Sequence, residues 1–159
     1  MATNNKNLSD YNIEKLPSAK GMRFAIIVSE WNRKITNNLF LGSEHTLINA
    51  GVKKNDIVRI DVPGSFEIIF AAKTASKHNY DAIICLGCII KGKTDHFHYV
   101  SNAVALGIKD LNLHAETPVI FGVLTDNNEQ QSIERSGGKL GNKGVEAAIT
   151  AIKMALLNK

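Results

Sequence analysis

Apolar residues along the chain gather in short runs that are rich in β-branched side chains. These runs are RFAIIVS at 23–29, IVRIDV at 57–62, AIICLGCII at 82–90 and PVIFGVLT at 118–125. Most of them are nearly continuous in apolar residues, which is typical of strands that are buried on both faces, as in a parallel sheet. The pattern therefore predicts one strand at each of these four positions.

The segments between and after these runs have the period of a helix. The spacing predicts helices over 35–50 and 66–78, from residue 96 onward, and over 129–136 and 143–157. Gly51 supplies a stop for the first helix, and Ser65 can cap the second. The residues expected to face the core are Ile35, Leu39, Leu47 and Ala50; Ile68, Ala72 and Ala75; Phe97, Val100, Val104, Ile108 and Leu111; and Val145, Ala148, Ile149, Ile152 and Leu156.

Strands that alternate with helices predict right-handed βαβ units and a single parallel sheet. The fold class is therefore α/β, a three-layer sandwich with a central four-stranded parallel sheet and helices on both faces. We expect one domain over 21–159 and a polar N-terminal arm over 1–20, which could add a strand to the sheet of a neighbouring copy. Ligands of such folds bind outside the carboxyl ends of the strands, and the site is expected there.

The composition restricts the class of ligand. The chain has 159 residues, of which 44% are apolar and 21% are charged, and its net charge is +4. No apolar run approaches the ~20 residues of a membrane span, and the N-terminus lacks the apolar core of a secretory signal. We therefore expect a cytoplasmic protein with no membrane partner. Because the basic residues are spread along the chain, without aromatic residues between them, a small anionic ligand is favoured over nucleic acid.

Several chemical patterns overlap in the segment GCIIKGKTDHFHYV, at 87–100. Its first letters fit the phosphate-loop pattern G-x-x-x-x-G-K-[ST]. However, two predicted strands precede this match, whereas a phosphate loop follows the first strand of its domain. Cys88, Ile89 and Ile90 are strand-like residues that suit such a loop poorly. Asp126 ends a strand and could serve Mg²⁺, so a nucleotide-binding protein stays open as a lesser alternative.

The same segment contains a C-x-x-C and an H-x-H pattern, and geometry opposes a redox or metal role for both. Cys85 and Cys88 lie in one predicted strand, where an offset of three directs their side chains to opposite faces of the sheet. His96 and His98 would be ~200° apart around a helix axis, so they cannot share an ion. We predict two core cysteines and no metal site.

The remaining interpretation is an anion site at the start of a helix. Thr94 or Asp95 can cap a helix that begins at His96, after Gly92 and Lys93. Backbone N–H groups at a helix N-terminus bind an anion without any nucleotide. His96 would then lie in the first turn, beside the bound anion, where it could transfer protons.

With these residues identified, the chain from residue 21 to residue 157 resembles the lumazine synthase family. The matching blocks are VSEWN (28–32), VPGSFEI (62–68), GCIIKGKTDHFHYV (87–100), VIFGVLT (119–125) and IERSGGKLGNKGVEAA (133–148). The resemblance implies a flavodoxin-like scaffold and the penultimate step of riboflavin biosynthesis. In that step 5-amino-6-ribitylaminouracil condenses with 3,4-dihydroxy-2-butanone 4-phosphate to 6,7-dimethyl-8-ribityllumazine, with release of phosphate and water and without a cofactor.

The resemblance also implies a role for each matched position, with His96 as the residue that transfers protons. Trp31 matches an aromatic ring that stacks on the pyrimidine. The turn from Ser65 through Phe66 to Glu67 matches the segment that holds the ribityl chain. The strand end formed by Cys88, Ile89 and Ile90 matches the backbone that binds the uracil. The remaining positions match phosphate-binding residues (Lys93, Thr94 and Arg135), an aromatic residue donated by the adjacent subunit (Phe121) and a lysine near the pyrimidine (Lys143).

Departures from the family pattern lie in the expected phosphate loop. Lys91 replaces a more usual arginine, Lys93 replaces a small residue, and Asp95 replaces a residue that is often Pro or Thr. These changes bear on the affinity for phosphate and leave His96 in place.

The resemblance further implies a homo-oligomer with sites between subunits, at least a ring of five. The short GGKLGNKG turn, at 137–144, is compatible with a shell of sixty copies, and riboflavin synthase is an implied partner. A different class of function on the same scaffold, a non-catalytic shell protein that binds flavin or lumazine, remains the main alternative.

Overall fold

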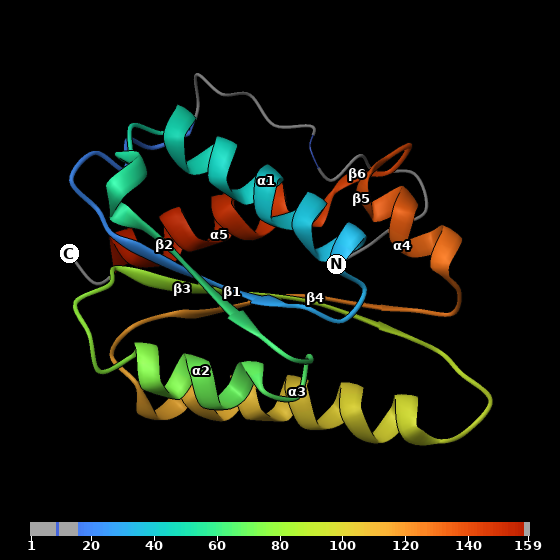
Figure 1. The fold of residues 1–159 in the computed structure, drawn as a ribbon. Helices are drawn as coiled ribbons and strands as arrows, with labels where there is room; N and C mark the ends of the chain where they lie inside the picture. The colour runs from blue at the N-terminus through green and yellow to red at the C-terminus, as the bar shows by residue number, and fades with distance from the viewer. Residues whose placement is uncertain (1–8, 10–15, 158–159) are drawn as a thin grey trace.

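The predicted strands form one parallel sheet in the computed structural model, which describes residue 9 and residues 16–157 (Figure 1). The strands are β1 (Phe24–Ser29), β2 (Ile57–Val62), β3 (Ala82–Ile90) and β4 (Val119–Asp126), in the spatial order β2-β1-β3-β4. Every neighbouring pair is parallel. Most of the proposed N-terminal arm lies outside the described residues, so its role and the domain boundary at residue 20 stay predictions.

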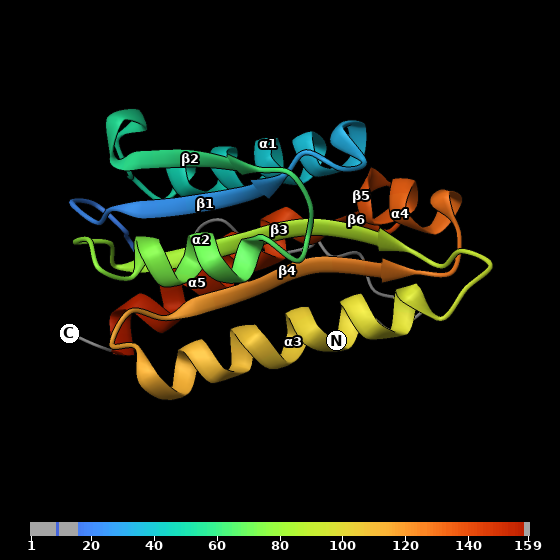
Figure 2. The ribbon, with the colours of Figure 1, turned by 60° about the horizontal axis from the view of Figure 1, so that its bottom comes forward.

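Helices cover both faces of this sheet and complete three layers. They are α1 (Arg33–Asn49), α2 (Ile68–Ala75), α3 (His96–His114), α4 (Glu129–Arg135) and α5 (Lys143–Leu157). Helices α2 and α3 lie on one face, and α1, α4 and α5 lie on the other (Figures 1 and 2). The α/β class, the four-stranded parallel sheet and the two helical layers are therefore confirmed.

The sheet separates the core into two apolar clusters. Phe24, Ile26 and Val28 of β1 belong to the cluster under α1 and α5, and the alternating residues Ala25 and Ile27 belong to the cluster under α2 and α3. Both sets are almost fully buried. The strand is therefore apolar at every position because both of its faces meet helices.

Some short elements were not predicted. Residues Lys54–Asp56 form a 3₁₀ turn before β2, and Ser136–Gly138 (β5) pairs antiparallel with Gly141–Asn142 (β6). Gly137 and Gly141 have φ values of 117° and 84°, a region that glycine occupies without steric cost. These glycines allow the chain to reverse between α4 and α5, so that α5 returns along the sheet.

The prediction that Ser65 caps the second helix is wrong. That helix begins at Ile68, and Glu67 occupies the N-cap position without a side-chain capping hydrogen bond. The Ser65 hydroxyl is instead buried without a hydrogen-bond partner. The inner faces predicted for the first two helices are nevertheless confirmed, since their residues are buried.

The inner stripe predicted for the last helix is partly wrong. Val145 and Ile149 are only half-buried and Leu156 is exposed, whereas the small residues of α5 face inward. These buried residues are Gly144, Ala147, Ala148, Ala151, Ile152 and Ala155. The reason is the close approach of α5 to α1, which large side chains would prevent.

The closest part of this approach is at Gly144. A Cβ atom added there would collide with the backbone carbonyl oxygen of Leu39 and lie 2.7 Å from its carbonyl carbon. The Ser43 hydroxyl donates a buried hydrogen bond of 2.8 Å to the Gly144 carbonyl oxygen. Glycine is therefore needed at position 144 because helix backbone occupies the space of a side chain.

We expect Gly144→Ala to destabilise the fold, because α5 must shift away from α1. The expected loss in the free energy of unfolding is at least about 1–3 kcal/mol, the usual cost of overpacking. Denaturant or thermal unfolding measures it. Lys153→Ala, at an exposed position of the same helix, is the matched control and should change stability by less than about 0.5 kcal/mol. Equal stability of the two variants would contradict the contact.

Candidate active site

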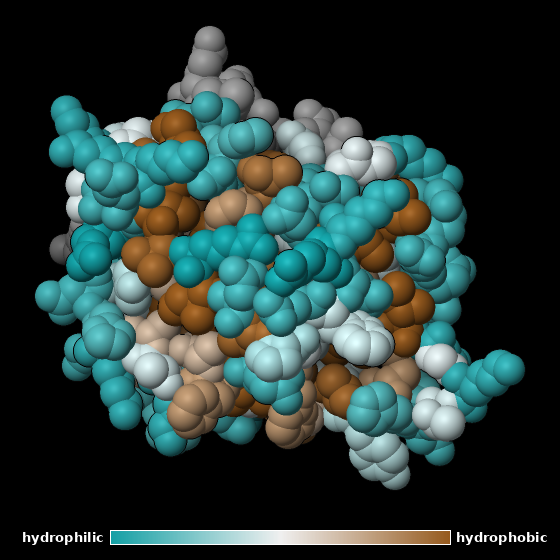
Figure 3. Space-filling model, viewed as in Figure 1, coloured by the Kyte–Doolittle hydropathy of each residue, from teal (hydrophilic) through white to brown (hydrophobic). Residues whose placement is uncertain are grey.

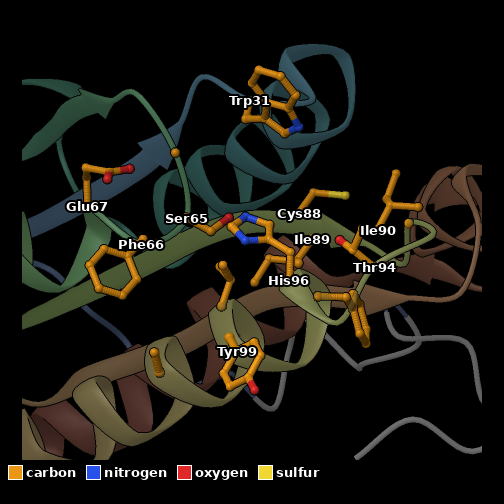
Figure 4. A pocket seen from close by; sticks show the side chains of 15 residues that line it. Trp31, Ser65, Phe66, Glu67, Cys88, Ile89, Ile90, Thr94, His96 and Tyr99 are labelled. Atoms are coloured by element: carbon orange, nitrogen blue, oxygen red, sulfur yellow. The ribbon is translucent and has the colours of Figure 1, made fainter.

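A pocket of about 830 Å³ opens at the carboxyl end of the sheet (Figure 4). Its walls come from the turn after β1, the turn after β2, the end of β3 and the first turns of α3. This is the location that a parallel α/β fold favours for ligands. The lining residues are Trp31, Gly64, Ser65, Phe66, Glu67, Cys88, Ile89, Ile90, Gly92, Thr94, His96, Phe97, Tyr99, Val100 and Ala103.

Most of the candidate site residues therefore meet in one pocket. The exceptions in this chain are Lys93, Phe121, Arg135 and Lys143, which do not line it. The lining residues that sequence analysis missed include Tyr99, which lies one helical turn after His96 on α3. Spacing of three along a helix places two side chains on one face, and this signal could have identified Tyr99.

His96 is the first residue of α3, and its side chain is exposed to the pocket. Figure 4 shows its ring directed from the start of the helix into the middle of the pocket. Asp95 occupies the N-cap position, but its side chain makes no capping hydrogen bond. The predicted helix start is confirmed, whereas the predicted side-chain cap by Thr94 or Asp95 is not formed. An anion can therefore accept from the first backbone N–H groups of α3.

The Ser65 hydroxyl is the buried polar group of this pocket that lacks a partner. Its Oγ makes no hydrogen bond to the described residues, although Ser65 is only 7% exposed. It lies close to β3, since a Cβ atom added at Gly87 would be 2.7 Å from it. A buried hydroxyl without a partner costs free energy, so a polar ligand group at this point would be stabilised.

Aromatic side chains border the same pocket and are unusually exposed. Trp31 is 71% exposed, Phe66 is 54% exposed and Tyr99 is 75% exposed. They come from three different elements and surround the pocket opening in Figure 4. Large apolar side chains gathered around an opening mark a surface for a ligand or another protein chain.

Asn32 supports the pocket from behind and was also missed. Its φ is 58°, the left-handed region, which asparagine tolerates better than most residues. Its side-chain Nδ2 donates a hydrogen bond of 3.0 Å to the carbonyl oxygen of Cys88. Asn32 therefore joins the turn that carries Trp31 to the end of β3. An asparagine in the turn that follows a strand was the available signal.

The cysteines lie on opposite faces of the sheet, as predicted. Cys85 belongs to the cluster under α2 and α3, and Cys88 belongs to the cluster under α1 and α5. Burial raises the pKa of Cys85 and raises the pKa of Cys88 to about 11. Both side chains are therefore thiols at neutral pH, whereas nucleophilic and redox cysteines are thiolates.

The strand end is also unsuited to a nucleotide loop. Cys88, Ile89 and Ile90 are paired with Leu124, Thr125 and Asp126 of β4, so they belong to the sheet. The Asp126 carboxylate, considered above for Mg²⁺, accepts a hydrogen bond of 2.8 Å from Ser132 and lies 3.7 Å from the Arg135 guanidinium. The backbone of Cys88–Ile90 and the carboxylate of Asp126 are therefore both engaged in contacts within the subunit, rather than free for a nucleotide and its Mg²⁺.

Of the candidate residues outside the pocket, Lys93 and Phe121 are exposed, whereas the side chains of Arg135 and Lys143 are each only 18% exposed. Phe121, in the middle of β4, is 37% exposed. Lys143 donates a hydrogen bond of 2.7 Å to Glu146 on the first turns of α5. Arg135 ends α4, where its Nη1 donates to the Gln131 carbonyl oxygen at 3.3 Å.

In the part of the chain that the structure describes, no helix is long and apolar enough to cross a membrane.

Comparison with known proteins identifies the relatives of this chain. The family model described as 6,7-dimethyl-8-ribityllumazine synthase matches residues 21–159. A protein of that name from Flavobacterium johnsoniae is 55% identical over 100% of this chain and 84% of its own length. Another from Christiangramia forsetii is 54% identical over 100% of this chain and 96% of its own. A third, from Porphyromonas gingivalis, is 48% identical over 100% of this chain and 99% of its own.

The strained turn at Asn32 leads to a stability prediction. Asn32→Gly removes the hydrogen bond to Cys88 but keeps a residue that adopts positive φ freely, whereas Asn32→Ala removes both advantages. We therefore expect the alanine variant to be less stable than the glycine variant by about 1 kcal/mol, the cost of the left-handed conformation. Thermal unfolding of the two variants beside the unchanged protein measures it. If alanine were as stable as glycine, the backbone strain at this turn would be refuted.

Proposed function

The chain belongs to the 6,7-dimethyl-8-ribityllumazine synthase family, and on this premise we propose how its residues perform the family's reaction. The protein is a transferase of riboflavin biosynthesis that joins 5-amino-6-ribitylaminouracil to 3,4-dihydroxy-2-butanone 4-phosphate. The observation that carries the residue assignment is the meeting of His96, Trp31 and the Ser65–Glu67 turn in one pocket. A base, a stacking surface and polar groups for a sugar alcohol are the parts that these two substrates require.

The ribitylaminouracil occupies the part of the pocket between the ends of β1 and β3. The Trp31 indole, 71% exposed, offers a flat face for the pyrimidine. The backbone at the end of β3, from Cys88 to Ile90, borders the ring edge. The ribityl hydroxyls meet the turn after β2, where the unpaired Ser65 Oγ and the exposed Glu67 carboxylate supply polar partners.

The phosphate of the second substrate binds at the start of α3. The loop before this helix is exposed from Lys91 through Asp95, so it can receive a group from solvent. Backbone N–H groups at the helix N-terminus and the Thr94 hydroxyl donate to the phosphate oxygens. Lys93 adds a positive charge and Asp95 a negative one, and these departures from the family pattern act in opposite directions on phosphate affinity.

His96 transfers protons between the two bound substrates. The aryl amine of the uracil attacks the ketone, water leaves and a Schiff base forms. A proton is then removed from C3 of the butanone as the C–O bond from C4 to phosphate breaks. The enol left at C3 becomes a ketone, the second amine adds to this carbonyl carbon, and a second water leaves as the ring closes. The His96 ring lies one residue beyond the phosphate-binding loop, where it reaches the carbon that loses the proton and the leaving phosphate oxygen.

Three of the residues outside the pocket are assigned to a neighbouring copy of the chain. The family implies an oligomer, and Phe121, Arg135 and Lys143 do not line the pocket of their own subunit. We propose that Phe121 covers the pyrimidine, Lys143 lies near it and Arg135 contacts the phosphate. A planar, permanently charged guanidinium suits that contact. A ring of five, its assembly into a shell of sixty, an association with riboflavin synthase and a cytoplasmic location belong to the same proposal.

Mixing the purified protein with both substrates tests the assignment. The lumazine chromophore should appear, and no product above the uncatalysed background would refute the function. Tight binding of riboflavin without turnover would instead support the non-catalytic shell protein.

His96→Ala should lower kcat about 100-fold, because proton transfer contributes on that scale, while inorganic phosphate still binds. An unchanged kcat would remove His96 from the mechanism. His98→Ala, an exposed histidine on the same helix that does not line the pocket, is the matched control and should keep kcat within about twofold.

Complementation tests whether two copies share a site. Arg135→Ala alone should raise the KM for the phosphorylated butanone and leave the KM for the uracil substrate unchanged. When His96→Ala and Arg135→Ala subunits are unfolded together and reassembled, about one quarter of the sites should receive both intact residues if neighbours share them. Activity of the mixture should therefore exceed the average of the two variants. Activity equal to that average would place both residues in the site of one subunit.

A further inference from the structure

We propose that Asp126 is a positioning residue for Arg135, and that Ser132 fixes the Asp126 carboxylate in the orientation this requires. The inference rests on the proposed function, in which Arg135 contacts the substrate phosphate. It adds residues that do not touch the substrate but determine where the guanidinium lies.

The contacts form a chain from the pocket wall to Arg135. The Cys88 Sγ donates to the Ser132 Oγ at 3.4 Å, and the Ser132 Oγ donates to the Asp126 Oδ2 at 2.8 Å. The other carboxylate oxygen, Oδ1, lies 3.7 Å from the Arg135 Nη1. The thiol and the hydroxyl both donate toward the carboxylate, and the guanidinium approaches the other oxygen of the same carboxylate from the opposite end.

Burial makes this ion pair different from the surface pairs of the molecule. The side chains of Arg135 and Asp126 are 18% and 9% exposed, whereas those of Arg33 and Glu30 are 67% and 45% exposed. An exposed pair contributes little to a fixed geometry, because two long side chains remain mobile in water. A buried carboxylate must keep its counter-charge nearby, so Asp126 restricts the space in which Arg135 can move.

Ser132 prevents the carboxylate from rotating away. Ser132 is fully buried, and its hydroxyl donates a hydrogen bond to the Asp126 carboxylate. Helix α4 supplies the serine and also ends in Arg135, so the helix is attached to β4 at two points of the same carboxylate. The start of α4 is capped by Asn128, whose side chain accepts from the backbone N–H of Gln131 at 3.0 Å.

The contacts of Arg135 leave two nitrogens of its guanidinium for a ligand. Both contacts that the structure gives Arg135, to the Asp126 carboxylate and to the Gln131 carbonyl oxygen, use Nη1. Nη2 and Nε are the remaining donors of the planar fork, and such a fork binds phosphate oxygens in pairs. Holding one nitrogen in place therefore orients the other two.

The backbone of Asp126 contributes a second connection. Its carbonyl oxygen accepts a hydrogen bond of 2.9 Å from the backbone N–H of Lys91, the first residue after β3. The loop from Lys91 to Asp95 is the proposed phosphate-binding loop of the same subunit. Asp126 is therefore attached both to this loop and to the arginine that the subunit presents to its neighbour.

Steady-state kinetics of Asp126→Asn test the proposal. The amide keeps the size of the side chain and can accept from Ser132, but it no longer attracts the guanidinium. The KM for the phosphorylated butanone and the inhibition constant of inorganic phosphate should both rise about tenfold, as expected for a lost contact to a charged group. The KM for the uracil substrate should stay within about twofold of the unchanged value. Ser132→Ala should change the same constants in the same direction by a smaller factor.

Glu134→Gln is the matched control. It removes a negative charge from α4, next to Arg135 in the sequence, and leaves the contact between Arg135 and Asp126 in place. The Glu134 carboxylate is instead bonded to Lys139 at 3.0 Å and Gln130 at 3.3 Å. This control should leave both constants for phosphate ligands nearly unchanged. Tighter phosphate binding in Asp126→Asn would show that Asp126 only weakens the positive charge of Arg135, and would overturn the proposal. So would a loss of thermal stability with unchanged KM values.

The outcomes also separate this inference from the proposed function. If the unchanged protein forms no lumazine, the function is refuted. If the unchanged protein is active and Asp126→Asn binds the phosphorylated substrate equally well, the function stands and the positioning role is refuted.

Discussion

The pairing of β3 between β1 and β4 is the constraint on which the pocket depends. In the parallel register, Leu86 of β3 lies beside Val28 of β1, and Ile90 lies beside Asp126 of β4. β3 therefore extends past the end of β1 and forms the floor of the pocket. The turns after β1 and β2 end above this floor, and α3 begins beyond it. A slip of one residue would move every side chain of β3 to the other face and would separate His96 from the turn that carries Ser65.

The residues that stabilise the sheet are buried, whereas the residues that can contact a ligand at its edge are exposed or unpaired. The core residues of β1 and β3 are almost fully buried, and the clusters on the two faces supply the stability. At the pocket, by contrast, Trp31 and Tyr99 are largely exposed and the Ser65 hydroxyl is unpaired. Figure 3, which views the molecule from the side of the edge strand β2, shows further apolar residues among the polar ones. A single subunit therefore exposes apolar and polar groups that are available to a substrate or to another protein chain.

Periodicity in the sequence predicted the layers well because each strand and helix has one dominant apolar pattern. The stripe of Ile68, Ala72 and Ala75 was correct, since these residues belong to the apolar cluster on the face of the sheet that α2 and α3 cover. Periodicity predicted the inner face of α5 less well, because α5 packs against α1 as well as against the sheet. The contact with α1 requires small residues, and Val145 and Ile149 are therefore only half-buried. Contacts between distant segments do not appear in local periodicity.

For the site as well, features that are adjacent in the sequence could be predicted, and contacts that depend on the fold could not. The position of His96 could be predicted, since a helix start, a glycine and a polar turn are adjacent in the sequence. Asn32 was not identified as a support because its partner, Cys88, lies 56 residues along the chain, and Asp126 was not because its contact with Arg135 requires α4 to fold back against β4. The sequence alone suggests Asp126 only as a ligand for Mg²⁺, whereas in the structure its carboxylate lies 3.7 Å from the Arg135 guanidinium.

The position of Asp126 also gives a physical reason why neighbouring sites would depend on one another. Its backbone holds the start of the loop that precedes His96, and its carboxylate holds the arginine that we assign to the next subunit's phosphate. A shift of this one residue would therefore alter two phosphate sites, one through Lys91 and one through Arg135. Because the carboxylate is buried, such a shift would expose or unpair a charge, which costs far more than a change at the surface. The two sites are thus connected by a group that the fold strongly resists moving, so that each subunit presents its arginine at a position set by its own sheet.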